Sequence, residues 1–327
     1  MARTLIGLVG DVGGTNARFA LAQLSDGVVR LENPVSLRAA DYPSGADAVR
    51  AFLDGLGARE RPRLAVIAAA GPIEHGAVEF TNNTAWRFSE CDLARDCGLA
   101  AVRLINDFTA QALAIDHLTA GDLRRIGPPG EPLARATAAI LGPGTGFGSG
   151  AQVDDGESRA ILSGEGGHTG FAPGDEVELE IVRRLMVRFG RVSVERLISG
   201  PGLLNLYQAL ADIRGEAAVC GRPDEVTRQG LAGEPLARAA LDRFCAMLGS
   251  VAGDFALALG ARRGVYIAGG IAPGIFDVLE ASDFRRRFEA KGRMSDYLKP
   301  IPTFVVTAPH AALLGSASQL TALEALV

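Results

Sequence analysis

Two glycine-rich stretches combine residue types that can hold the phosphates of a nucleotide. The first runs from Gly10 to Thr15 (Gly-Asp-Val-Gly-Gly-Thr), and the second runs from Gly142 to Gly150 with glycine at every second position. Glycine lets a backbone approach an anion closely and turn its N–H groups toward it. Each stretch lies between two runs of strand-forming residues, whereas a P-loop or a Rossmann turn leads from a strand into a helix. The sequence therefore predicts two phosphate-binding loops of another kind.

The first loop also carries a candidate partner for a metal ion. We expect Gly13, Gly14 and Thr15 to offer N–H and hydroxyl donors to phosphates, while Asp11 is the only charged residue of the motif before Arg18. A carboxylate would repel phosphates unless a cation lay between them, so Asp11 is the candidate Mg²⁺ partner, through a water molecule. The alternatives are that Asp11 ends a strand and caps a turn, and that the second loop is only a flexible hairpin.

Asp107 is the candidate general base. It stands beside Asn106, after the apolar run 102–105 and at the start of a helical pattern. Phosphoryl transfer needs positioning, charge neutralisation and a carboxylate that accepts the proton of the attacking hydroxyl. An aspartate at a helix start is also a preferred N-cap, which is a purely structural alternative. Ala110 stands where a capping box would place Glu or Gln, and this weakens the alternative.

Hydrophobic patterns predict the elements that must position these residues. The predicted strands cover residues 5–9, 17–24, 28–31, 63–70, 102–105, 264–268 and 303–306; the predicted helices cover 45–57, 177–189, 203–213, 235–260 and segments that open at 108 and 311. The continuous apolar run 63–70 is typical of a strand buried on both faces. The Pro- and Gly-rich stretch 127–132 is a candidate domain crossing. The second loop repeats the first design about 130 residues later, which predicts a faint internal duplication.

Length and composition favour a two-domain globular protein, because 327 residues can form two compact domains that each bury a core. The net charge of −5 makes a nucleic-acid partner unexpected. The four cysteines form no Cys-x-x-Cys pair, which argues against zinc or haem and favours reduced thiols in the cytoplasm. We expect no signal peptide, because Asp11 follows before an N-terminal apolar run reaches the length of one, and no membrane span, because Asp254 cuts the apolar stretch that begins at Phe244. Gly249 and Gly253 are expected to let helices pack closely.

The ordered motifs resemble those of the bacterial-type glucokinases, in the hexokinase and actin-like ATPase superfamily, over almost the whole chain. They are Gly10-Asp11-Val12-Gly13-Gly14-Thr15-Asn16, Thr81-Asn82-Asn83-Thr84, Leu104-Ile105-Asn106-Asp107-Phe108-Thr109-Ala110, Gly144-Thr145-Gly146, Gly164-Glu165-Gly166-Gly167-His168, Glu195-Arg196-Leu197-Ile198-Ser199-Gly200-Pro201-Gly202 and Ile267-Ala268-Gly269-Gly270-Ile271. The resemblance implies an α/β fold of two actin-like ATPase (ribonuclease H-like) domains, with mixed β-sheets flanked by helices. The active site is then expected in the cleft between the domains, which closes when sugar binds.

The resemblance also implies domain bounds, cofactors and partners. The small domain would comprise residues 1–117 plus 308–327, with the first phosphate loop and part of the sugar site. The large domain would comprise residues 118–307, with the second loop, the adenosine site and the rest of the sugar site. ATP with Mg²⁺ and glucose would be the small-molecule ligands. The protein would be a cytoplasmic homodimer with no nucleic-acid or membrane partner.

Sugar hydroxyls donate and accept hydrogen bonds, so a hexose site needs clustered carboxylates and amides. The resemblance implies as glucose ligands Asn106, Asp107, Glu165, His168 and Glu195, with Asp107 near the reacting 6-hydroxyl. Taken alone, His168 would more often be a structural histidine and Glu195 a solvated helix residue. The glycines around Glu165 predict that its backbone needs unusual freedom.

The resemblance implies a second set of residues that bind the nucleotide: Gly10, Asp11, Val12, Gly13, Gly14, Thr15, Gly144, Thr145, Gly146, Gly269 and Gly270. Gly269 and Gly270 would form the adenosine-facing turn, and the alternative is an ordinary turn between a strand and a helix. Residues 81–83 are expected to line the sugar pocket. The segment 84–86 is one residue longer than the family spacing, so their individual contacts stay unassigned.

The predicted activity is ATP-dependent phosphorylation of D-glucose at the 6-hydroxyl, which gives glucose 6-phosphate and ADP. One alternative is a kinase for another hexose or with ADP or polyphosphate as donor. A second is a sugar-sensing regulator on the same fold, which would carry a DNA-binding domain before Gly10, where only about nine residues stand. Related repressors and kinases hold zinc through cysteines after the histidine, whereas residues 169–173 here contain none. An actin-like polymer former would not need the sugar-binding set.

Overall fold

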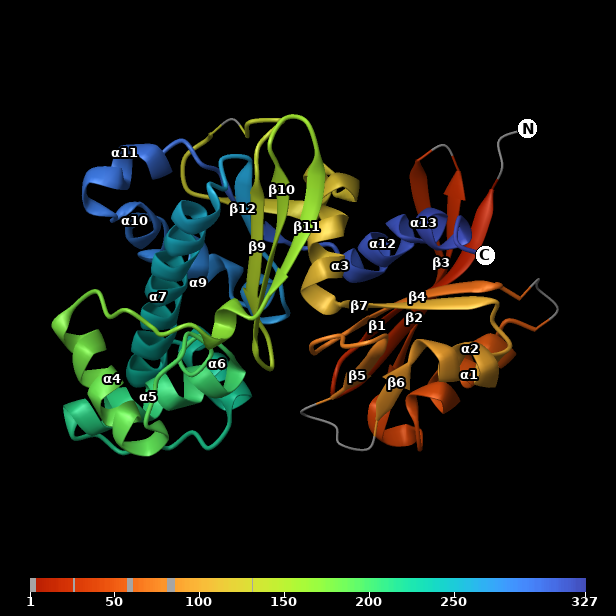
Figure 1. Ribbon diagram of the computed structural model, residues 1–327. Helices are drawn as coiled ribbons and strands as arrows, with labels where there is room; N and C mark the ends of the chain where they lie inside the picture. Colours follow the sequence, from red (N-terminus) through yellow and green to blue (C-terminus); the bar gives the residue numbers. More distant parts are fainter. Residues whose placement is uncertain (1–3, 26, 58–60, 81–85, 131) are drawn as a thin grey trace. The chain divides into compact units, whose positions relative to one another are not determined.

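The chain folds into two compact units (Figure 1). The computed structural model describes residues 4–25, 27–57, 61–80, 86–130 and 132–327. One unit comprises Met1–Thr119 with Ala308–Val327, and the other comprises Ala120–Thr307. The Pro- and Gly-rich stretch 127–132 is not the crossing between them. It follows β8 (Leu123–Ile126), which already pairs with β13 (Thr303–Val306) in the sheet of the second unit.

The first unit is built on a five-stranded mixed sheet in the order β3-β2-β1-β4-β7, beside a two-stranded sheet of β5 and β6. Its further elements are β1 (Leu5–Val12), β2 (Asn16–Ser25), β3 (Val28–Arg38), α1 (Gly45–Gly55), β4 (Leu64–Ala69), β5 (Ala77–Glu79), β6 (Arg87–Ser89), α2 (Glu90–Cys97), β7 (Ala101–Asn106), α3 (Asp107–Ala114), α12 (Ala311–Ser318) and α13 (Leu320–Glu324). Strand β1 runs antiparallel to β2 and parallel to β4, which runs parallel to β7.

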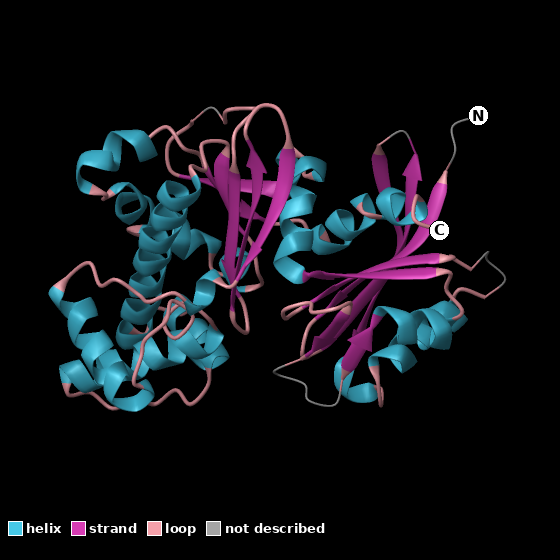
Figure 2. Cartoon of the chain, viewed as in Figure 1, coloured by secondary structure: helices cyan, strands magenta, loops and turns pink. Residues whose placement is uncertain are grey.

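Helices cover both faces of this sheet (Figure 2). Successive side chains of a strand point to opposite faces, so Leu8 of β1 packs in the core on one side and Val9 packs with α12 and α13 on the other. Strand β4 does the same, with Ile67 on the first side and Val66 on the second. Every residue of β4 is buried. The prediction of a strand buried on both faces is confirmed.

The second unit is built on a six-stranded sheet in the order β11-β10-β9-β12-β13-β8. Its further elements are β9 (Ala138–Pro143), β10 (Phe147–Asp154), β11 (Arg159–Gly164), α4 (Glu176–Phe189), α5 (Gly200–Arg214), α6 (Pro223–Leu231), α7 (Pro235–Leu259), β12 (Gly264–Ile267), α8 (Ile271–Gly274), α9 (Phe276–Ala281), α10 (Phe284–Glu289) and α11 (Ser295–Leu298). Short 3₁₀ turns occur at η1 (Ala39–Asp41), η2 (Ile115–His117), η3 (Ala120–Asp122), η4 (Gly166–His168) and η5 (Gly292–Met294).

The two sheets repeat one topology. In each, three antiparallel strands joined in sequence are followed by two strands parallel to the first, which gives β3-β2-β1-β4-β7 and β11-β10-β9-β12-β13. In each, the glycine-rich loop connects the first two strands of the meander. The predicted strand–loop–strand design and its duplication are therefore confirmed.

Close helix contacts explain two glycines of α7. A side chain at Gly249 would collide with the backbone carbonyl of Phe284, and one at Gly253 would collide with that of Phe288, both in α10. The predicted packing role of this glycine pair is confirmed. None of the helices within the described part of the chain has the length and apolar character needed to cross a bilayer.

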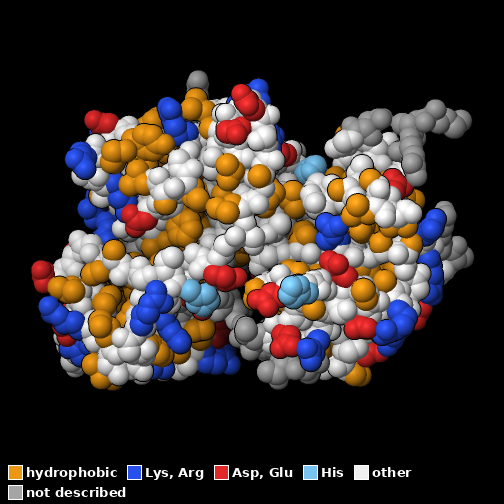
Figure 3. Space-filling model, viewed as in Figure 1, with side chains coloured by type: hydrophobic (Ala, Val, Ile, Leu, Met, Phe, Trp, Pro, Cys, Tyr) orange, Lys and Arg blue, Asp and Glu red, His pale blue; other side chains and the backbone are white. Residues whose placement is uncertain are grey.

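Polar caps and glycines set the ends of the longer helices. The side chain of Ser44 accepts the backbone N–H of Asp47 at the start of α1, and Ser199 accepts that of Gly202 at the start of α5. Gly215 and Gly260 end α5 and α7 in the left-handed conformation. On the face drawn in Figure 3, basic and acidic side chains are interspersed.

Candidate active site

In the first unit, the predicted phosphate loop and the predicted base lie at the same edge of the sheet. Parallel pairing places Val12 opposite Ala69, and Ala69 opposite Asn106. The loop after β1 and the residues after β7 therefore emerge together at the carboxyl ends of these strands. Ligands of open α/β sheets bind at such carboxyl ends.

The first loop is the turn of the β1–β2 hairpin. It is closed by a hydrogen bond from Gly13 N to Asn16 O at 2.9 Å. A side chain added at Gly13 would meet only that oxygen, 3.8 Å away, so the space beside the loop is open. Gly10 and Val12 lie within the strand instead. Gly10 packs against the ring of Phe19, and the side chain of Val12 is fully buried.

Asp11 pairs with Arg18, directly across the hairpin. Arg18 Nη1 donates to Asp11 Oδ2 at 2.9 Å. Burial raises the pKa of Asp11 above its ordinary value, while the charges of Arg18 and His310 act in the opposite direction. The Asp11 side chain is 21% exposed.

Asn106, and not Asp107, caps helix α3. The side-chain oxygen of Asn106 accepts the backbone N–H of Phe108 at 2.9 Å and that of Thr109 at 3.2 Å. Its amide nitrogen donates to the carbonyl of Gly71 at 3.2 Å, which ties it to the segment that follows β4. Asp107 is the first residue of the helix, is half-buried, and also accepts the N–H of Phe108. The structural alternative for Asp107, an N-cap, is therefore wrong.

The second unit brings its own loop and the glycine pair Gly269-Gly270 to one edge. Strands β9 and β12 run parallel, and a side chain at Gly142 would collide with the carbonyl of Ala268. Gly269 has a φ of +83° and packs against the carbonyl of Pro143, so both its turn and its close approach require glycine. The second loop is closed by a hydrogen bond from Gly144 N to Gly146 O at 2.8 Å.

The same unit gathers Glu165, His168 and Glu195. Glu165 precedes the short turn η4 and His168 ends it, with Glu165 Oε2 and His168 Nε2 3.9 Å apart and both side chains more than half exposed. Glu195 lies in a turn rather than in a helix, so the alternative of a solvated helix residue is wrong. Its carboxylate accepts the N–H of Phe147 at 2.8 Å, and its own N–H donates to Gly167 O at 2.9 Å.

Close packing explains two of the glycines around Glu165, Gly166 and Gly167, whereas Gly164 has open space beside it. Gly166 and Gly167 do not have positive φ. A side chain at Gly166 would collide with the ring of Phe255, and one at Gly167 would collide with the carbonyl of Phe147. At these two positions the fold requires the absence of a side chain. The backbone of Glu165 itself is neither helical nor extended, and its need for unusual freedom stays a prediction.

The predicted site residues thus form two groups, each assembled within one unit. The first holds Asp11, Asn106 and Asp107 with the loop Gly13–Thr15. The second holds Glu165, His168 and Glu195 with the loop 144–146 and the pair 269–270. The predicted sugar-site segment 81–83 lies outside the described residues.

The structure adds residues that the sequence patterns did not indicate. Arg18 and His310 act on Asp11, and Ser149 contacts the turn that carries Glu165. Strand pairing opposite Asp11 could have pointed to Arg18. The other two depend on contacts between segments that are distant in sequence.

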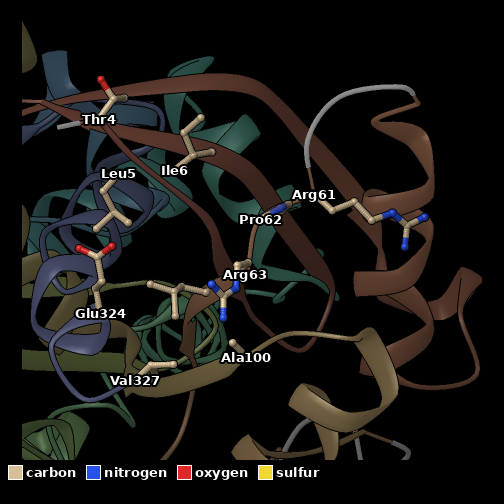
Figure 4. Close-up of a pocket in the computed structure, with 10 residues that line it drawn as sticks. Thr4, Leu5, Ile6, Arg61, Pro62, Arg63, Ala100, Glu324 and Val327 are labelled. Carbon is tan, nitrogen blue, oxygen red and sulfur yellow. The ribbon is translucent and has the colours of Figure 1, made fainter. Parts of the chain in front are cut away.

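A cavity of about 350 Å³ lies at the other edge of the first unit's sheet (Figure 4). Its lining includes Leu5 and Leu64, the first residues of β1 and β4, together with Arg61, Arg63 and Glu324. The phosphate loop follows the opposite, carboxyl end of β1. This cavity is therefore not part of the candidate active site.

Sequence comparison covers almost all of the chain. A model of the family described as glucokinase matches residues 8–323. A glucokinase from Caulobacter sp. is 51% identical over 316 residues, which make up 97% of this chain and 95% of that protein.

Solved structures share the fold. The crystal structure of a glucokinase from an Antarctic psychrotroph superposes with a TM-score of 0.86 at 36% identity, covering 98% of this chain and 99% of that one. A ROK family glucokinase from Streptomyces griseus, solved in complex with glucose and AMPPNP, gives a TM-score of 0.64 at 18% identity, covering 96% and 98%. The predicted α/β class, with two mixed sheets flanked by helices as in actin-like ATPases, is confirmed. The chain belongs to the glucokinase family and is an enzyme of that family.

Proposed function

We propose that this enzyme transfers the terminal phosphoryl group of ATP to the 6-hydroxyl of D-glucose, with Asp107 as the general base. The observation that carries the proposal is the division of roles at the start of α3. Asn106 holds the helix N-terminus, so the Asp107 carboxylate is not required as the cap and lies at the edge of the sheet that carries the phosphate loop. Membership in the glucokinase family supports the choice of donor and acceptor.

In this mechanism, the two glycine loops hold the phosphates through backbone N–H groups. The sugar is bound by Asn106, Glu165, His168 and Glu195, whose carboxylates, amide and imidazole can pair with hydroxyls that both donate and accept. Asp107 accepts the proton of the 6-hydroxyl while the oxygen of that hydroxyl attacks the γ-phosphorus. The bond between the γ-phosphorus and the β,γ-bridging oxygen of ATP breaks. ADP and glucose 6-phosphate then leave.

The donor set of the first unit fits a magnesium ion that arrives with ATP. In the described part of the chain, no three His, Cys, Asp or Glu side chains are grouped so that they could hold a metal ion. Mg²⁺ keeps several of its waters and is usually bound by one or two carboxylates together with substrate phosphates. The side chain of Asp11 is partly exposed, and its carboxylate would accept hydrogen bonds from such waters. Bound Mg²⁺ would neutralise charge on the phosphates as the transfer proceeds.

A coupled ATP/Mg²⁺ assay with glucose, mannose, fructose, glucosamine and N-acetylglucosamine tests the proposal, with ADP and polyphosphate as alternative donors. We expect a strong preference for glucose with ATP. Activity on another sugar or donor would change the assigned substrate and leave the assignment of Asp107 as the general base in place. Sugar binding without turnover for every pair would contradict the proposal and favour a sugar-sensing regulator.

The homodimer and the cytoplasmic location expected from the family resemblance stay predictions. Light scattering of the purified protein near 1 μM tests the first: we expect twice the 34.1 kDa of the chain.

A further inference from the structure

The two peptide groups on either side of Glu165 are held by one buried hydroxyl. Ser149 Oγ accepts the N–H of Gly166 at 3.0 Å and donates to the carbonyl of Gly164 at 3.2 Å. Ser149 is only 3% exposed, and its backbone stands opposite Gly164 in the β10–β11 ladder. A single side chain therefore fixes the position of the Glu165 backbone.

Glu165 needs such a support because no regular element holds it. Its φ of −99° and ψ of 50° belong to neither helix nor strand, and its side chain is 58% exposed. The first residues of β10 also anchor the other side of the turn. The carbonyl of Phe147 touches Gly167, and the N–H of Phe147 binds the carboxylate of Glu195.

Strand β10 begins directly after the second phosphate loop. Phe147 therefore binds the carboxylate of Glu195, and Ser149 binds the peptide groups on both sides of Glu165, three to five residues beyond Gly144. Removal of the Ser149 hydroxyl would leave the partly buried N–H of Gly166 without its acceptor, which usually costs more than the hydrogen bond itself contributed. The turn can escape that cost only by shifting, and Glu165 would shift with it.

We propose that Ser149 is a positioning residue for the sugar, which acts through the backbone of Glu165 and does not touch the substrate. This inference rests on the proposed function, because it takes Glu165 as a glucose ligand. It predicts that Ser149→Ala weakens glucose binding about tenfold. The KM for ATP and the turnover at saturating glucose should stay within about threefold of the wild type.

The test compares Ser149→Ala with Thr303→Val. Thr303 is also a fully buried hydroxyl residue of the same sheet, and its Oγ1 donates to the carbonyl of Ile126 at 2.6 Å, but it lies at the start of β13. Calorimetry measures the dissociation constant of glucose without ATP, steady-state kinetics measure KM and kcat, and thermal unfolding reports the stability of each variant. Ser149→Cys keeps a weak hydrogen-bonding group and should give an intermediate dissociation constant, which serves if the alanine variant does not fold.

The expected result is a higher glucose dissociation constant and glucose KM in Ser149→Ala alone, with glucose affinity unchanged in Thr303→Val. An unchanged glucose dissociation constant in Ser149→Ala would overturn the inference and leave the proposed function intact. Equal losses in both variants, in proportion to stability, would reduce Ser149 to a structural residue. A wild type that binds glucose without phosphorylating it would contradict the proposed function, and the Ser149 inference would then be decided by the dissociation constants alone.

Discussion

At the scale of single residues, two neighbouring polar side chains have different roles at the start of α3. Asn106 satisfies two N–H groups of the first turn and binds the carbonyl of Gly71, while Asp107 begins the helix. Both residue types are good N-caps, so sequence alone does not decide which of two adjacent positions takes that role. The distinction depends on where β7 ends, and helix and strand ends are the least predictable part of a pattern.

The loop glycines separate into those that the fold needs and those that it does not. Gly142 and Gly269 have backbone atoms of the same unit where a side chain would lie, whereas nothing lies within 4 Å of that position at Gly144. Gly144 also lacks a positive φ. A glycine that neither packing nor backbone conformation requires is the better candidate for close approach to a ligand.

Gly144→Ala should therefore leave the fold intact and weaken the binding of the nucleotide. We expect the KM for ATP to rise about tenfold, or ~1.4 kcal/mol, with an unchanged melting temperature, because the added methyl group would occupy space next to the phosphates. Gly55→Ala is the matched control, since Gly55 also has open space around it and lies in α1. An ATP KM equal to that of the wild type would show that the loop does not approach the phosphates.

At the scale of elements, the hydrophobic period predicts the buried strands and the long helices. Strand β13 was predicted at its observed bounds, and the bounds observed for α4 and α7 lie within one residue of those predicted. Elements with few buried side chains leave no such period. Helix α6 buries only Val226 and Gly230, and β11 has no buried residue, so neither was predicted. Helix α6 is held by a capping interaction and β11 by its ladder with β10, and neither leaves a hydrophobic period in the sequence.

A buried charge cluster joins three helices of the second unit. Glu178 of α4 is fully buried, and its carboxylate accepts hydrogen bonds from Arg287 of α10 at 2.8 Å and from Arg243 of α7 at 3.2 Å. The N–H of Gly174 adds a third bond at 2.7 Å. Loss of one partner from such a cluster strongly destabilises the protein, because the remaining charges stay buried.

Glu178→Gln should lower the free energy of unfolding by about 3–5 kcal/mol, since the buried Arg287 guanidinium loses its buried counter-charge and keeps only the partly exposed Asp175, 3.6 Å away. Urea unfolding followed by circular dichroism gives the difference. Glu180→Gln is the control on the same helix, because Glu180 pairs with the exposed Arg183 and Arg184 and should matter little. Equal effects of the two substitutions would show that the buried cluster adds no stability.

At the scale of the whole molecule, the chain uses one sheet topology twice, and each copy brings a glycine loop to the carboxyl end of its first strand. The duplication was predictable from the repeated strand–loop–strand pattern. The grouping of the sugar-binding residues was not, because Glu195 meets Phe147 only through the folded path of the second unit.

Because the proposed ligands of the sugar are divided between the two units, glucose should draw the units together. We expect saturating glucose to reduce the radius of gyration in small-angle scattering, and ATP alone to do so less, since closure around the sugar keeps water from the phosphoryl group. Galactose at the same concentration is the control for a general osmolyte effect. A radius of gyration that glucose leaves unchanged would count against ligand-driven closure.

The most direct test of the central claim is the turnover of Asp107→Ala measured beside its glucose affinity. Asp47→Ala is the control, because Asp47 also lies in the first turn of a helix in the same unit. If Asp107 takes the proton of the 6-hydroxyl, kcat should fall by at least about 10²–10⁴-fold while the glucose dissociation constant changes by no more than about tenfold. Near-normal turnover in Asp107→Ala, or an equal loss in Asp47→Ala, would contradict the assignment of Asp107 as the general base.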